Sequence, residues 1–174
     1  MIVPCPIFKW ERECENCGAT IEVYYPPDVA FEFKLGNVNV KEICVEREKG
    51  LEFAHKAIVL DNQCLVIANV CPLCKTPIKE LDLYFELISM LFNGIDVQVE
   101  WVAFESDDFC SWCDKRLSEL RVAEIESEAW DYKRRIITAM NRKDRDAGYL
   151  VQNLYSIIYH PLCRECEGNR NLEK

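Results

Sequence analysis

The chain has 174 residues, of which 49% are apolar and 29% are charged, a balance that is typical of globular proteins and excludes a wholly disordered chain. Its 30 acidic and 21 basic side chains give a net charge of −9, which argues against non-specific nucleic-acid binding by the surface as a whole. No apolar run approaches the roughly 18 residues that span a bilayer. The first residues lack the basic and apolar segments of a signal peptide, so we expect a cytoplasmic protein in a reducing compartment.

The N-terminal half is predicted to be rich in β-structure. Pro26-Pro27 marks a loop after the first expected strand. Gly36-Asn37 and Asp61-Asn62-Gln63 are turn sequences that would join the later strands into two hairpins. The last strand leads directly to Cys71. In chain order, the expected strands are residues 21–25, 31–35, 38–42, 57–60 and 65–70.

After Pro77 the spacing of apolar residues changes to that of a helix, which is predicted to end near Asn93-Gly94. A short strand is expected next, because Val97, Val99 and Trp101 alternate with polar residues. The residues that carry the helical spacing are Leu81, Tyr84, Phe85, Ile88, Leu91 and Phe92.

The C-terminal half is predicted to be mainly helical. Ser118 is a suitable N-cap for a helix that would run to about Asp146, before Gly148. Residues 149–159 are apolar, and we expect them to be buried as either a short helix or a strand. The apolar stripe expected along the long helix consists of Leu120, Ala123, Trp130, Ile137 and Met140.

Eight of the 11 cysteines fall into four C-x-x-C pairs. Two cysteines separated by two residues can both reach one tetrahedral metal ion, so four pairs complete two sites. Thioredoxin-type chemistry would need a single pair beside a βαβ pattern, and the common ferredoxin spacings crowd three cysteines together. We therefore predict two structural Zn²⁺ ions, and redox catalysis and iron–sulfur ligation remain the weaker alternatives. The predicted ligands are Cys14, Cys17, Cys71, Cys74, Cys110, Cys113, Cys163 and Cys166.

The spacing favours sequential pairing of these ligands. The interval from Cys17 to Cys71 is similar to that from Cys113 to Cys163, which indicates two consecutive modules with one metal each. The alternative is a cross-braced arrangement, in which the first pair joins the third and the second joins the fourth. His160 precedes Cys163 by three residues and is a weaker candidate ligand. The remaining cysteines are expected to act as small buried apolar residues; they are Cys5, Cys44 and Cys64.

The residues around the cysteines resemble known zinc-binding modules. Cys14-Glu15-Asn16-Cys17-Gly18 with the following strand, and Val70-Cys71-Pro72-Leu73-Cys74-Lys75, look like the two knuckles of a zinc ribbon. Residues 110–115 and 160–166 are similar to treble-clef zinc knuckles. The resemblance covers little beyond the four knuckles. It implies structural zinc in proteins of many functions, and so identifies a class of metal site only.

One basic segment stands out from the acidic background. On a helix, three of its arginines would share one face, where they could contact phosphate. The alternative, which we favour, is a solvated helix end whose cations suit the macrodipole. The segment contains Lys133, Arg134, Arg135, Arg142, Lys143 and Arg145. Aromatic residues near knuckles and turns are expected mostly to pack, with a minority anchoring an interface; they are Trp10, Tyr24, Tyr25, Trp112 and Trp130.

The sequence supplies little for an enzyme. It has only His55 and His160, no H-E-x-x-H, and enough cysteine to close both metal sites. A zinc-supported nuclease would need a catalytic histidine between paired knuckles, and we predict no catalytic residues.

We therefore predict an α+β protein with a β-rich, ribbon-like zinc module at 1–78, a helix–strand connector at 79–105, and a helical, treble-clef-like zinc module at 106–174. Two four-cysteine zinc sites would change the net charge from −9 to about −13. The expected function is non-enzymatic interaction with, or regulation of, another protein with a basic surface, for example within a nucleic-acid-handling machine. The alternatives are nucleic-acid binding through residues 133–145, an acidic decoy of a nucleic-acid-binding protein, and a zinc-supported nuclease.

Overall fold

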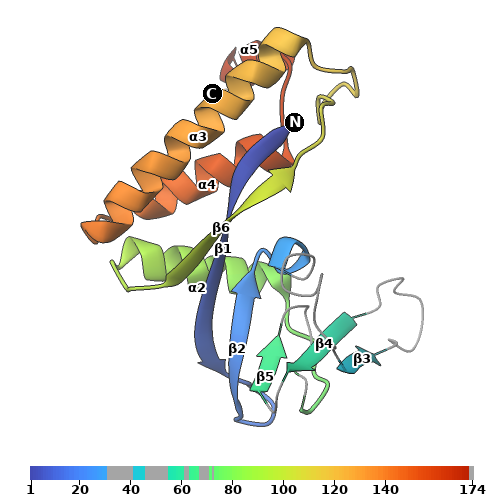
Figure 1. The fold of residues 1–174 in the computed structure, drawn as a ribbon, viewed down its shortest axis with the longest axis vertical. Coiled ribbons are helices and arrows are strands. Elements are labelled where there is room, and N and C mark those ends of the chain that lie inside the picture. The colour runs from blue at the N-terminus through green and yellow to red at the C-terminus, as the bar shows by residue number, and fades with distance from the viewer. Residues whose placement is uncertain (31–40, 46–54, 61–62, 67–70, 72, 173–174) are drawn as a thin grey trace. The chain divides into compact units, whose positions relative to one another are not determined.

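The computed structural model describes residues 1–30, 41–45, 55–60, 63–66, 71 and 73–172. Strands and helices are mixed along the chain (Figure 1), as the α+β prediction requires. None of the described helices is long and apolar enough to cross a membrane. In chain order the elements are β1 (Ile2–Glu13), β2 (Thr20–Tyr25), β3 (Lys41–Val45), β4 (His55–Leu60), β5 (Gln63–Val66), α2 (Glu80–Phe92), β6 (Gln98–Glu105), α3 (Glu119–Asn141), α4 (Asp146–Tyr159) and α5 (Arg164–Leu172).

The chain divides into two compact units. The β unit consists of residues 6–87 and 97–100, and the helical unit consists of residues 1–5, 88–96 and 101–174. Strands β1 and β6 and helix α2 each run from one unit into the other. The segment expected as a helix–strand connector, residues 79–105, contributes residues to both units.

The strands form one sheet in the order β3-β4-β5-β2-β1-β6. Strand β1 pairs antiparallel with β2, from Phe8 opposite Tyr25 to Glu13 opposite Thr20. Strands β3, β4 and β5 are also antiparallel, and β5 joins β2 in parallel. The hairpin predicted around residues 61–63 is confirmed in β4 and β5. The hairpin predicted around Gly36-Asn37 lies mostly outside the described residues.

Strand β1 was not predicted from the sequence. Its residues 3–8 are buried one after another, including Val3, Ile7 and Phe8 at no more than 1% exposure. A strand that is buried continuously lacks the alternation of apolar and polar residues by which half-buried strands are recognised. The prolines at positions 4 and 6 weaken the strand signal further.

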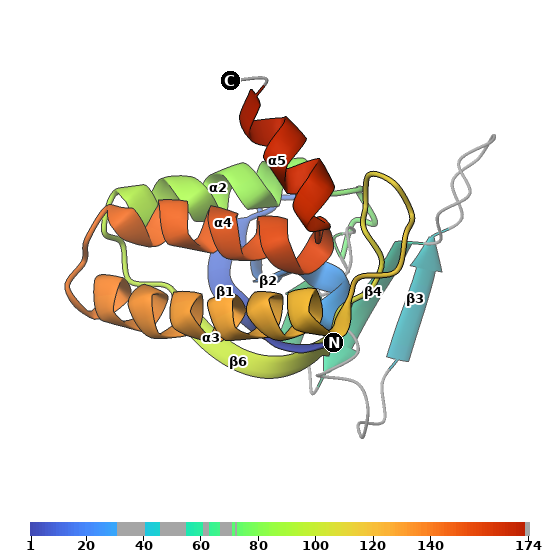
Figure 2. The same cartoon turned by 90° about the horizontal axis from the view of Figure 1, so that it is seen from above.

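The predicted long helix divides into two helices that lie side by side (Figure 1 and Figure 2). Ser118 caps α3 as predicted, and its hydroxyl accepts a hydrogen bond from the Arg121 amide. The helix ends at Asn141, not near Asp146, and Lys143 follows with a φ of 55°. Residues 149–159, left open between helix and strand, belong to α4. Gly148 was expected beyond the helix, but it lies within α4, where a Cβ would come within 3.0 Å of the Phe92 ring.

The buried face of α3 is also not the predicted one. Most residues of the expected stripe lie towards solvent: Leu120 is 68% exposed and Trp130 is 49% exposed, whereas Met140 is half-buried. The residues that face the core are instead Ile125, Ala129, Ile136 and Ala139. Two apolar spacings coexist on this helix, and packing against α4 selects the one with the smaller side chains, which permits close approach.

Candidate metal centres

Three of the four C-x-x-C pairs share one backbone turn. In each, the backbone amide of the first cysteine, at position i, donates to the carbonyl of residue i+5. The amide of residue i+4 donates in turn to the carbonyl of the first cysteine. Residue i+4 has a left-handed backbone conformation in every case. The turn directs both sulfur atoms of a pair towards one point. The three first cysteines are Cys14, Cys71 and Cys110, and the left-handed residues are Gly18 (φ 70°), Lys75 (φ 61°) and Asp114 (φ 56°).

The fourth pair lies at the beginning of a helix. Cys163 directly precedes α5, Cys166 lies in its first turn, and the Glu167 amide donates to the Cys163 carbonyl at 3.0 Å. The two metal centres thus differ in backbone construction, although both contain four sulfurs.

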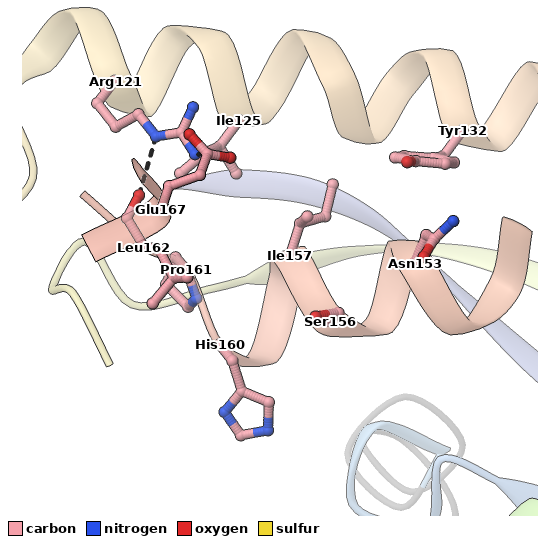
Figure 3. A pocket seen from close by; sticks show the side chains of 10 residues that line it. All are labelled: Arg121, Ile125, Tyr132, Asn153, Ser156, Ile157, His160, Pro161, Leu162 and Glu167. Carbon is pink, nitrogen blue, oxygen red and sulfur yellow. Dashed lines mark hydrogen bonds and ion pairs between the residues drawn. The ribbon is translucent and has the colours of Figure 1, made fainter. Parts of the chain in front are cut away.

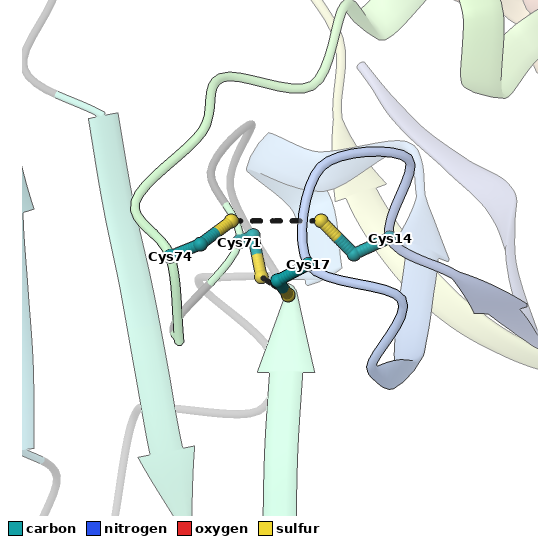
Figure 4. A group of neighbouring side chains, drawn as sticks. All are labelled: Cys14, Cys17, Cys71 and Cys74. Carbon is teal, nitrogen blue, oxygen red and sulfur yellow. Dashed lines mark hydrogen bonds between the residues drawn. The ribbon is translucent and has the colours of Figure 1, made fainter.

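The first group, within the β unit, consists of Cys14, Cys17, Cys71 and Cys74. Figure 4 shows the four side chains converging from the β1–β2 loop and from the segment that precedes α2. The Sγ atoms of Cys14 and Cys74 are 3.6 Å apart, and those of Cys17 and Cys71 are 3.9 Å apart. Cys14 and Cys71 are buried, whereas Cys17 is exposed.

The second group, within the helical unit, consists of Cys110, Cys113, Cys163 and Cys166. The Sγ atoms of Cys113 and Cys163 are 3.8 Å apart. Ser111 joins the two pairs, because its amide and its hydroxyl both donate to the Pro161 carbonyl, at 2.9 and 3.2 Å. Cys110 packs with Leu117, Ile125 and Leu162 in a buried apolar cluster. The second centre is therefore continuous with the core of its unit.

The sulfur geometry fits a tetrahedral metal ion. Within each group the four ligand atoms lie within 4.8 Å of one another. Four sulfurs at about 2.3 Å from a central ion would be separated by roughly 3.8 Å, close to the separations in the structure. A disulfide would require about 2.05 Å. The grouping is sequential, so the cross-braced alternative is wrong. His160 belongs to neither group.

Each group contains one thiol with a lowered pKa and one with a raised pKa. Burial raises the pKa of Cys71 to about 12, and the hydrogen bond with the Cys163 side chain raises that of Cys166 to about 12. Hydrogen bonds from the Thr76 hydroxyl and the Asn16 side chain lower the pKa of Cys74 to about 5. Burial raises the pKa of Cys110, but the backbone amides of Cys163 and its own knuckle outweigh burial and bring the pKa to about 6. In both cysteines the lowered pKa favours the thiolate, which is the form that binds a metal ion. A cation that binds all four sulfurs would displace the remaining protons.

The three other cysteines lie outside these groups. Cys5 is buried, and desolvation raises its pKa to about 12, which suits the predicted role of a small apolar residue. Cys44 lies on β3 and Cys64 on β5, and their side chains fall outside the described part of the chain.

The basic segment does not form a single charged face. Lys133 lies over the rings of Trp101 and Trp130, at 5.3 and 5.0 Å. Lys143 pairs with Asp96 at 2.9 Å. Arg134 and Arg135 share Asp131, at 2.9 and 3.9 Å. Among the described residues, Arg142 and Arg145 make no ion pair. A cavity of about 430 Å³ between α3 and α4 is lined by Arg134, Arg135 and Arg142, together with Asp144, Asp146 and Tyr149.

The five aromatic residues near knuckles and turns divide into packed and exposed side chains. Trp10 is buried, its Nε1 donating to Glu86 at 3.1 Å, and Tyr24 is buried as well. Tyr25 packs against Tyr84, with ring centroids 5.7 Å apart. In contrast, Trp112 is 53% exposed and Trp130 is 49% exposed.

A second cavity, of about 340 Å³, lies beside the second metal centre (Figure 3) and was not predicted from the sequence. Its α3 wall contains Arg121, Ile125 and Tyr132. These residues recur at four and seven positions and so share one helix face. That spacing was the available signal, but a face that mixes charged, aliphatic and aromatic residues does not stand out as an amphipathic stripe.

Comparison of the chain with protein-family models, with curated proteins and with solved structures found no match.

Proposed function

We propose that the protein is a non-enzymatic scaffold with two structural zinc ions that binds another protein through exposed side chains on its knuckles. The observation that carries the proposal is the pair of complete four-sulfur groups. Thiolates are soft ligands that suit Zn²⁺, and four of them leave no coordination position for water or substrate. A catalytic zinc needs such a position.

The backbone around each four-cysteine group supports a class of zinc module for each half of the chain. Two knuckles facing one another in the first group correspond to a zinc ribbon. A knuckle that faces the first turn of α5 in the second group corresponds to a treble clef. In both, the metal would hold together segments far apart in the sequence, which is a structural role.

Two exposed apolar residues favour a protein as the partner. Leu73 and Trp112 each stand immediately before the second cysteine of a pair, and they are 57% and 53% exposed. Large apolar side chains on rigid, metal-held turns are suitable interface anchors, and tryptophan is enriched among binding hot spots. The net charge of −9 favours a partner with a basic surface, as found in nucleic-acid-handling machines.

The test is affinity capture by the metal-loaded protein from a native cell extract, followed by mass spectrometry. We expect one or more basic proteins to be retained after nuclease treatment and to be lost with Trp112→Ser or Leu73→Ser. Leu120→Ser is the matched control, because Leu120 is 68% exposed and lies on α3, outside the knuckles. Equal capture by the knuckle variants and the control would contradict the proposed surface.

Nucleic-acid binding is the second candidate, favoured by one observation. Arg142 makes no ion pair among the described residues and lines a cavity with Arg135. If these guanidinium groups contact phosphates, Arg135→Glu with Arg142→Glu should weaken oligonucleotide binding and flatten its salt dependence. A salt-dependent affinity for DNA or RNA that this double variant abolishes would replace the protein-partner proposal.

A further inference from the structure

The solvent-facing side of α3 carries a regular row of residues, which we call the α3 seam. Its members recur alternately at three and four positions, the heptad spacing by which helices pair. All of them are exposed, and the large apolar ones are Leu120 at 68%, Trp130 at 49% and Ile137 at 38%. At 100° per residue the seam lies on the side of the helix opposite the buried residues Ile125 and Ile136. The seam consists of Leu120, Ala123, Ser127, Trp130, Arg134 and Ile137.

The apolar residues of the seam form a long contact surface. The rise of the helix between Leu120 and Ile137 is about 26 Å. Large apolar side chains aligned in solvent over such a distance are typical of a surface that binds another protein. Trp130 is held in this row by Lys133, whose Nζ lies 5.0 Å from the centroid of its ring.

The charges of α3 are divided between its two halves. Residues 119–128 contain four acidic side chains and one basic side chain, a net charge of −3, whereas residues 129–141 contain three basic side chains and one acidic side chain, a net charge of +2. Two copies of α3 in antiparallel orientation would bring the acidic half of each against the basic half of the other. A parallel pair would instead oppose like charges. The helix is therefore electrostatically complementary to a second copy of itself, as a two-fold symmetric interface requires.

The antiparallel orientation also matches the seam residues by size. A two-fold axis midway between Ser127 and Trp130 sets the small serine of one copy against the large tryptophan of the other. The same axis sets an alanine against an arginine and joins two aliphatic side chains at each end of the seam. The facing pairs, each of which occurs twice, are Leu120 with Ile137, Ala123 with Arg134, and Ser127 with Trp130.

We propose that the protein forms a two-fold symmetric dimer in which the α3 helices of two copies pack antiparallel along this seam. The inference is independent of the proposed function, because no residue of the seam belongs to a knuckle. A seam of about two and a half heptads gives an interface at the small end of specific ones, so we expect a dissociation constant in the micromolar range. Leu120→Ser should also weaken the dimer, but it leaves the knuckle side chains unchanged and so remains a control for them.

Sedimentation velocity of the metal-loaded full chain over a range of concentrations measures this association. Ala123→Arg should weaken it by more than about tenfold, because it places two arginines opposite one another at two places in each dimer. Addition of Arg134→Ala to this variant exchanges the two residues between facing positions and keeps the composition and the net charge. This exchange should restore most of the lost affinity, which only the antiparallel register predicts.

Ala103→Arg is the matched control, since Ala103 is exposed and lies on β6, outside the seam. It should leave the association unchanged. Zinc content and amide dispersion establish that each variant is folded before it is measured. A wild-type chain that stays monomeric at every concentration overturns the inference, as does association that Ala123→Arg leaves intact or that the exchanged variant fails to recover.

Discussion

Replacement of Cys71 by serine tests how the two metal centres are organised. The Cys71 side chain is fully buried, and its sulfur lies 3.9 Å from that of Cys17. Serine would leave three sulfurs and a poor oxygen ligand in the first group. Apparent zinc-binding free energies of small cysteine-rich modules are about 10–16 kcal/mol, whereas whole domains are stable by only about 5–15 kcal/mol. Loss of this metal is therefore expected to unfold the β unit.

Two measurements give the outcome. The zinc content, measured by elemental analysis of protein purified without chelator, should fall from two ions per chain to one. Two ions correspond to one for each four-sulfur group. Hydrogen exchange should show loss of protection in the β1–β2 ladder, where Phe8 pairs with Tyr25, and retained protection in α3 and α4. Cys163→Ser should produce the reverse pattern.

Cys5→Ser is the matched control for the same chemical change, since Cys5 is buried but belongs to neither group. It should lower the stability slightly and leave the zinc content unchanged. Damage from Cys71→Ser that spreads equally into the helical unit would refute the reasoning. A metal-free wild-type protein with four disulfides, or a coloured iron-containing one, would refute the assignment of zinc.

Three further predictions concern the stability of the metal-loaded protein, measured by urea unfolding. Ser118→Ala removes the N-cap of α3 and should cost about 1 kcal/mol; no loss would mean that the cap is dispensable. Gly148→Val brings side-chain carbon within 3.0 Å of the Phe92 ring and should cost about 1–3 kcal/mol, clearly more than Gly168→Val, where nothing lies within 4 Å. Lys75→Gly relieves a left-handed residue with a φ of 61° and should stabilise the β unit by up to about 1 kcal/mol; destabilisation would show that the lysine side chain has another role.

Features carried by short stretches of chain could be predicted from the sequence. The C-x-x-C spacing identified all eight sulfurs that the structure brings together, because a knuckle is a turn formed by consecutive residues. Ser118 marked the beginning of α3, Asn93-Gly94 marked the end of α2, and the turn at residues 61–63 marked the β4–β5 hairpin. Each is a preference of local backbone dihedral angles and hydrogen bonds.

Features that depend on contacts between residues far apart in the sequence could be established only from the tertiary structure. The path of the chain decides which pairs of cysteines meet. Packing around the second metal centre buries Ile125 with Cys110 and Leu162, while Trp130 faces solvent. Residues 3–8 of strand β1 are buried one after another, so their sequence lacks the apolar–polar alternation by which strands are recognised. Gly148 lies inside a helix because the Phe92 ring leaves no room for a Cβ there. The 340 Å³ cavity beside the second metal centre combines residues more than 30 positions apart. The sequence thus determined where turns, caps and metal ligands lie, because these depend on neighbouring residues. The tertiary structure decided which surfaces meet, because burial depends on residues distant along the chain.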